Sequence, residues 1–506
     1  MKKRILATVM SVLLIVCTLL TLASCAGGKK DDEVKPQIDR DWYDNLGEHN
    51  LDYTVKFAVS EALDGDTFHK RSIWAEADEG DSVDAAVFAR NKAIEARFNC
   101  TIELTYYTTD NLSTALANEL QSGGEAYDVL AARQYDDIAL CSKAYLVDIA
   151  KDEEVKPYIQ WKDNEFPYWG ERYIDGMSYK GQVYWLAGDL CLRYTGGFYC
   201  TFINATLYEE YLLEANGSIY DIVRDKKWTI DKMKQFADAA TTVEGLTIEE
   251  LLATGNGVTG IAMTIWDNTN GWAVAAGVNF SQKNKDGSVS LTFNTKNSTL
   301  DSFYTKYMDL IDSRGVTEVA TYDDCFKALV ANNALMVPGR LNQAETFLYT
   351  TTSSTPYYIV PCPLLKEGQD YRSSVHDAIN IYGISYGSQN KKATAIVLEA
   401  LCAESYRSVR PRYYDDALKF KYTTDMDSAA MIDIISEGSY IDFVLVWGFT
   451  DYFGGLGDPQ SVGNFLRNSM NSGLDSLTAL NKKVPAWNKA LKQIDEMFKK
   501  LAALES

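Results

Sequence analysis

Residues 53–59 read YTVKFAV, and Tyr53, Val55, Phe57 and Val59 alternate there with the intervening side chains. A period of two predicts a β-strand. Further along, apolar residues recur every three or four positions behind the polar cap Asp81-Ser82, which predicts a helix. The expected elements of this part are strands at 53–59, 102–106 and 128–131 and helices at 83–98 and 112–120. The order strand-helix-strand-helix-strand is typical of a doubly wound α/β unit with a mainly parallel sheet.

A second α/β unit follows. Its expected elements are strands at 198–203, 260–265, 334–337 and 378–385, helices at 228–240, 299–313 and 391–406, and a hairpin turn at Asp286-Gly287. Because 506 residues are too many for one hydrophobic core, two lobes are expected.

The amino terminus has the layout of an export signal. Lys2, Lys3 and Arg4 precede an apolar run over residues 5–22, which is long enough for a membrane helix. The sequence Leu22-Ala23-Ser24-Cys25 favours cleavage instead, because it resembles the lipobox of bacterial lipoproteins. The resemblance implies a signal peptide at 1–24, acyl chains such as palmitate on Cys25, and an extracytoplasmic protein tethered to the membrane through residues 25–50.

Composition limits the partners and cofactors. A net charge of −21 argues against nucleic acid as a partner, because phosphate backbones require cationic surfaces. The seven cysteines after Cys25 are odd in number and form no C-x-x-C pair, so they are expected to be buried small hydrophobes. With three scattered histidines, no metal site and no cofactor are expected.

Several short motifs, in order, resemble extracellular solute-binding proteins that feed ATP-driven (ABC) importers, the class that includes maltodextrin-binding protein. They are YDVL at 127–130, GMSYKGQVYWLA at 176–187, KWTID at 227–231, ALM at 334–336 and GISYGSQN at 383–390. The resemblance implies a periplasmic-binding-protein-like type II fold, with two doubly wound α/β lobes around a ligand cleft. It also implies a non-enzymatic protein that delivers a solute to permease subunits. The lobes are expected at 51–193 plus 372–418 and at 196–370 plus 419–506.

Polar and aromatic side chains follow the carboxyl ends of the expected strands, where ligands of open α/β sheets bind. Flat aromatic faces and hydrogen-bonding groups together suit a sugar, although each tryptophan taken alone could equally be a core residue. The candidate ligand-binding residues are Glu61, Arg133, Gln134, Tyr135, Trp266, Asn268, Trp272 and Arg340 at such strand ends, Trp185 and Asp189 at the expected first crossover, and His376 and Asp377 where the returning segment enters its strand.

Two apparent catalytic motifs lack the residues or the order of elements that their chemistry requires. The G-x-S-x-G at 383–387 would require a histidine base after Ser385, and none follows. The G-x-G-x-x-G at 255–260 precedes a strand rather than a helix, which is the wrong order for a dinucleotide loop. A lipid-anchored glycan-degrading enzyme stays open, because two carboxylates suffice for that chemistry. A peptide or another polar solute stays open as the ligand.

Overall fold

The computed structural model describes residues 46–61, 68–76, 82–108, 111–122, 125–143, 145–162, 168–293, 298–349, 355–414, 426–455, 458–471 and 476–504. The expected signal peptide, Cys25 and most of the tether therefore lie outside the described residues. Within these ranges no helix is both long and apolar enough to cross a membrane. Residues 42–506 belong to one compact unit.

The first sheet has the order β11-β3-β1-β2. Its strands are β1 (Tyr53–Ser60), β2 (Cys100–Tyr107), β3 (Val129–Arg133) and β11 (Asn380–Ile384). β1 runs parallel to β2 and β3, whereas β11 pairs antiparallel with β3. Every residue of β3 and of the edge strand β11 is buried, and both strands consist mostly of apolar residues.

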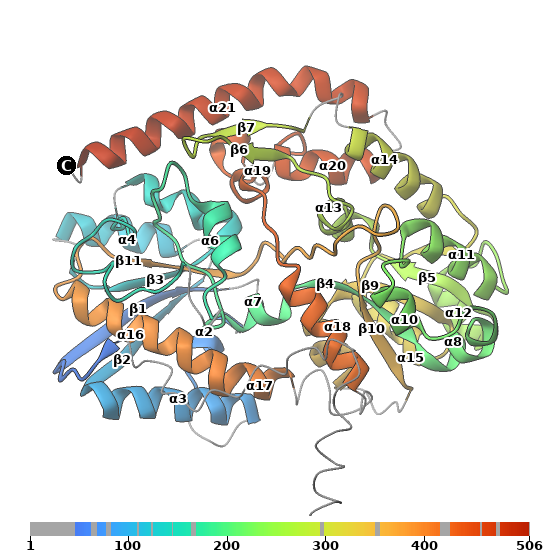
Figure 1. The fold of residues 1–506 in the computed structure, drawn as a ribbon, viewed down its shortest axis with the longest axis horizontal. Helices are drawn as coiled ribbons and strands as arrows, with labels where there is room; N and C mark the ends of the chain where they lie inside the picture. Colours follow the sequence, from blue (N-terminus) through green and yellow to red (C-terminus); the bar gives the residue numbers. More distant parts are fainter. Residues whose placement is uncertain are drawn as a thin grey trace, which may run out of the picture. The chain divides into compact units, whose positions relative to one another are not determined.

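Helices cover this sheet. α3 (Ser82–Phe98) turns Val87 and Ile94 inward, and α16 (Lys391–Glu404) is buried along most of its length. Figure 1 shows α16 running above and roughly along α3, and α4 (Asn111–Ser122) packs on β1. The Asn390 side chain caps α16 by accepting from the Ala393 N–H, as the motif at 383–390 predicts.

The second sheet has the order β10-β4-β9-β5-β8. Its strands are β4 (Tyr199–Asn204), β5 (Thr259–Met263), β8 (Val316–Glu318), β9 (Ala334–Arg340) and β10 (Tyr357–Pro361). Its main helices are α11 (Ile230–Ala240), α13 (Ile265–Ala275), α14 (Ser298–Ile311) and α15 (Tyr322–Val330). β5 is parallel to β8 and β9, but β4 is antiparallel to both of its neighbours.

The expectation of a mainly parallel sheet is confirmed for the first unit, where β1 runs parallel to β2 and β3 and only β11 is antiparallel. In the second sheet two pairings are parallel and two are antiparallel. Both sheets are mixed, because β4 and β11 enter from segments that cross between the sheets and so start at the edge where the parallel strands end. The hairpin is confirmed as β6 (Ser281–Lys283) and β7 (Val289–Leu291), with Gly287 at a φ of 77° in its turn.

The remaining helices are short, apart from those of the tail. They are α2 (Phe68–Ile73), α5 (Gln134–Asp137), α6 (Glu171–Met177), α7 (Leu192–Gly196), α8 (Ala205–Tyr211), α9 (Leu213–Asn216), α10 (Ile219–Arg224), α12 (Ile248–Thr254), α17 (Arg410–Arg412), α18 (Met426–Glu437), α19 (Phe443–Trp447), α20 (Val462–Asn471) and α21 (Ser476–Leu504).

The long helix α21 contacts both predicted lobes. Trp487 stacks on Phe293 with ring centroids 5.8 Å apart, whereas Phe498 stacks on Tyr179 at 4.9 Å. The predicted lobe boundaries, and in particular the placing of 419–506 in the second lobe, therefore stay a prediction. The seven body cysteines are free and buried, as expected.

Candidate functional site

The register of the strands brings polar loops together at one edge of each sheet. Tyr199 pairs with Arg340, so the start of β4 lies beside the carboxyl end of β9, and Asn380 pairs with Arg133 at the end of β3. Two of the segments that join the sheets also pair with each other, since the His376 N–H donates to the Gly197 carbonyl at 2.9 Å. His376 and Asp377 therefore lie where the carboxyl edges of both sheets meet.

Asp267, in the first turn of α13, is the centre of the polar group at this place. Its carboxylate lies 2.9 Å from Nη1 of Arg340, and the Tyr322 hydroxyl donates to it at 2.7 Å. Burial alone would raise the pKa of Asp267, but the Arg340 guanidinium and the neighbouring His376 outweigh burial and hold that pKa well below its usual range. Asp267 is therefore a fixed anion.

His376 is neutral near pH 7, because burial and the charge of Arg340 lower its pKa. Its Nδ1 accepts a hydrogen bond from the Ala378 N–H at 3.1 Å, so the proton resides on Nε2. That nitrogen lies 3.7 Å from Asp267 and 3.5 Å from Asp377. The imidazole therefore presents an N–H between two carboxylates rather than a charge.

A stack of aromatic rings and guanidinium groups extends from this polar group. The Arg467 guanidinium, from α20, lies 4.8 Å from the ring centre of Trp266 and 5.4 Å from that of Phe449. Phe449 meets Tyr135 edge to face at 6.1 Å, and the Arg133 guanidinium lies 4.4 Å from the Tyr135 ring. The stack joins the end of β5 to the end of β3, and Arg467 also pairs with Asp377 at 3.2 Å.

We call the polar group and the stack together the strand-end cluster. It consists of Arg133, Tyr135, Tyr199, Trp266, Asp267, Tyr322, Arg340, His376, Asp377, Phe449 and Arg467. Within the described part of the chain, the Nε atoms of Arg340 and Arg467 are buried and make no hydrogen bond. Such donors are rarely left unpaired in folded proteins, and they suit hydroxyl acceptors on a ligand.

Half of the predicted site residues belong to this cluster. Arg133, Tyr135, Trp266, Arg340, His376 and Asp377 are members, and Asn268 donates to the Tyr322 hydroxyl at 3.2 Å. Gln134 lies beside them and accepts a hydrogen bond from Tyr173. Glu61 follows β1, and its N–H donates to the Tyr107 carbonyl on the opposite side from β3.

Two predicted tryptophans lie in the core instead. Trp185 is buried and donates its indole N–H to the Ile138 carbonyl at 3.0 Å, and Trp272 is buried against Tyr307. Trp266, in contrast, exposes 41% of its surface. Trp266 and Trp272 were predicted after the same strand and Trp185 at the first crossover, but of the three only Trp266, in the first turn of α13, is exposed, so only Trp266 is available as a platform.

Asp189 lies elsewhere. Its carboxylate is buried and pairs with Arg410 at 3.2 Å, in a cavity that no member of the strand-end cluster lines. Of the five other members of the cluster, Asp267 follows the same strand end as Trp266, whereas Tyr199, Tyr322, Phe449 and Arg467 were missed. Phe449 and Arg467 belong to the tail, more than 180 residues from Trp266, and no local pattern marks them.

The chain resembles known proteins in sequence pattern and in fold. A family model described as "Bacterial extracellular solute-binding protein" matches residues 76–401. No curated protein matches the chain. Solved structures with TM-scores of 0.51, 0.55 and 0.54 are, respectively, an ABC substrate-binding protein from Listeria monocytogenes in complex with cycloalternan, a sugar transporter from Rhizobium etli in an open conformation, and a cyclo/maltodextrin-binding protein complexed with maltotetraose.

Sequence identity to these three structures is 12%, 12% and 13%. The matches cover 87%, 87% and 88% of this chain and 99%, 99% and 98% of those chains. At such identities the likeness concerns the fold alone.

Proposed function

Since the chain belongs to the family of bacterial extracellular solute-binding proteins, we propose that it captures a carbohydrate outside the cell and hands it to the permease of an ABC importer. The observation that carries the proposal is the strand-end cluster. Trp266 offers an exposed flat face, and the anion Asp267, the N–H of His376 and the arginines offer hydrogen bonds beside it. Sugars present apolar ring faces rimmed by hydroxyls, which require this combination.

Capture requires no covalent chemistry. The cluster draws side chains from both sheets, so a ligand held there bridges them and shifts the population of hinge states toward the closed one. Arg340 holds Asp267 as an anion, and His376 is neutral. The two side chains therefore suit hydrogen bonding to a ligand better than proton transfer in a reaction. A glycan-degrading enzyme remains the alternative of a different class.

Calorimetric titration of the purified protein with a panel of sugars and peptides tests this proposal. For the tightest sugar, Trp266→Ala is expected to weaken binding about tenfold or more, since loss of an aromatic platform costs on the order of 1 kcal/mol or more. Tyr386→Ala is the matched control, because this ring is also exposed but lies outside the cluster. Equal losses in the two variants, binding of peptides alone, or steady release of glycan products would each contradict the proposal.

We also propose that a lipid on Cys25 anchors the protein at the outer face of the cell membrane. A tethered receptor stays at a high effective concentration near its permease. In a lipoprotein-processing host, Cys25→Ser is expected to abolish incorporation of labelled palmitate and to release the protein from membranes. Retention of the label in this variant would refute the anchor.

A further inference from the structure

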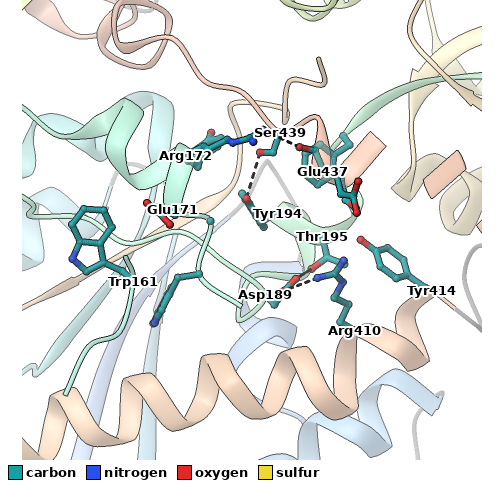
Figure 2. Close-up of a pocket in the computed structure, with 15 residues that line it drawn as sticks. Trp161, Glu171, Arg172, Asp189, Tyr194, Thr195, Arg410, Tyr414, Glu437 and Ser439 are labelled. Atoms are coloured by element: carbon teal, nitrogen blue, oxygen red, sulfur yellow. Dashed lines mark hydrogen bonds and ion pairs between the residues drawn. The ribbon is translucent and has the colours of Figure 1, made fainter. Parts of the chain in front are cut away.

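A cavity separate from the strand-end cluster lies next to the segments that cross between the sheets. It encloses about 280 Å³, and Figure 2 shows its walls. Trp161, Trp169, Asp189, Tyr194, Arg410 and Ser439 are among the side chains that line it, and no member of the strand-end cluster does. Tyr173 separates the two places, because it lines the cavity while its hydroxyl donates to Gln134 on the cluster side. We call this cavity the hinge pocket.

The name follows from the backbone around it. Phe198 is bridged to Val375, and Ser373 is bridged to Ser439, so three crossing segments lie side by side. The Ser373 N–H donates to the Gly438 carbonyl at 2.8 Å, and the Tyr440 N–H donates to the Ser373 carbonyl at 3.0 Å. Phe198 and Ser439 both line the pocket. Any rotation of one sheet against the other must therefore change its shape.

The walls of the pocket are rigid and aromatic. Trp169 is buried and its indole N–H donates to Glu399 at 2.6 Å, which fixes the orientation of the ring. Trp161 is half-buried, lies across the pocket from Tyr414 in Figure 2, and is joined there by the ring of Tyr194. Flat indole and phenol surfaces favour a ligand that has a flat, weakly apolar face.

The floor of the pocket is polar and electrically balanced. Asp189 is only 5% exposed, and its carboxylate pairs with Arg410 at 3.2 Å and accepts from the Thr195 hydroxyl at 3.4 Å. Ser439 adds a hydroxyl 3.5 Å from that of Tyr194. The charges of Asp189 and of Arg410, which is 20% exposed, compensate each other. Glu171, Arg172 and Glu437 also line the pocket, so its acids outnumber its cations by one and an anionic ligand is disfavoured. A hydroxyl group can donate to the Asp189 carboxylate and accept from the Arg410 guanidinium.

We propose that the hinge pocket is a second binding site, for a small neutral ring that carries several hydroxyls, such as a monosaccharide or a cyclic polyol. The volume matches a single ring, since it lies at the lower end of the roughly 300–1,000 Å³ of small-molecule pockets. The site stands apart from the proposed function. One consequence rests on that function: an occupant of the pocket changes the affinity of the strand-end cluster, because both sites depend on the same crossing segments.

The test is a calorimetric titration of the full chain with D-glucose and with myo-inositol to tens of millimolar. Trp161→Ala is expected to weaken binding of the better probe at least about tenfold. Tyr386→Ala, which truncates an exposed ring outside both the hinge pocket and the strand-end cluster, is the matched control and should leave this binding unchanged. Neither variant alters the strand-end cluster, so a misplaced strand-end site leaves the test of the hinge pocket intact.

A second measurement locates the probe. On addition of the better probe, amide hydrogen exchange should slow in residues 193–198 and 436–440 of the wild type, and this protection should be lost in Trp161→Ala. Absence of binding by both probes would overturn the proposal. It would also be overturned by binding that Trp161→Ala leaves unchanged, by equal losses in Trp161→Ala and Tyr386→Ala, or by protection confined to the strand-end cluster.

Discussion

Glu399 is a carboxylic acid in the interior of α16, with only 2% of its surface exposed. One carboxylate oxygen accepts from the indole N–H of Trp169 at 2.6 Å and from the Gln160 N–H at 3.2 Å, and the other accepts from the Tyr168 hydroxyl. Burial raises the pKa of Glu399 to about 7, although these three hydrogen bonds act in the opposite direction. The acid is therefore expected to titrate near neutral pH.

The raised pKa makes folding stability depend on pH. Between the ordinary value of 4.5 and about 7, the native state binds more protons at Glu399 than the unfolded chain does. The contribution of this group is therefore fully present below 4.5, and the free energy of unfolding falls as pH rises through the window. At 1.36 kcal/mol per pKa unit, the loss between about pH 5 and pH 7.5 is on the order of 2–3 kcal/mol.

Glu399→Gln removes the titration while keeping the shape. The amide oxygen can accept from Trp169 and Gln160, and the amide N–H can donate to Tyr168 once that hydroxyl turns to act as the acceptor. Urea unfolding of wild type and variant at several pH values measures the effect. His69, whose pKa burial lowers to about 3, contributes a slope of the opposite sign, so the difference between the two proteins at each pH is the quantity to compare.

Relative to wild type, the variant is expected to gain about 2–3 kcal/mol of stability between pH 5 and pH 7.5. A difference that stays constant across this range would refute the reasoning, because Glu399 would then titrate alike in the folded and unfolded states.

Three further predictions concern the core. Trp185→Ala should lower the free energy of unfolding by about 3–5 kcal/mol and leave the affinity for the strand-end ligand unchanged. A loss of affinity in the folded variant would show that Trp185 takes part in ligand binding. Gly260→Ala should lower the melting temperature markedly, because its Cβ would lie 2.3 Å from the Ala237 Cα, and overpacking costs typically about 1–3 kcal/mol; an unchanged melting temperature would contradict this packing. The seven buried thiols should react with a disulfide reagent only after denaturation. During unfolding Cys100, the least buried, should react first. Rapid reaction of the native protein would contradict the burial of these thiols.

Much of the fold was predictable because its signals are local. The alternation at 53–59, the capped helix at 83–98 and the motif at 383–390 each concern neighbouring residues, and the structure has a strand or helix at each. The short strands β8 and β10 were missed, since three and five residues with no clear period carry little signal. The direction of β4 and β11 was also missed, because it depends on the edge at which a crossing segment enters the sheet.

The site divides in the same way. The sequence by itself indicated which side chains follow strand ends, namely Arg133, Tyr135, Trp266 and Arg340, and which enter the returning strand, namely His376 and Asp377. Their role in binding a ligand stays a prediction. Only the tertiary structure decided that Trp185 and Trp272 face the core, that Asp189 lies in the hinge pocket, and that Phe449 and Arg467 complete the stack. The physical reason is range: backbone preference and periodicity act over a few residues, whereas burial and charge pairing act between side chains hundreds of positions apart.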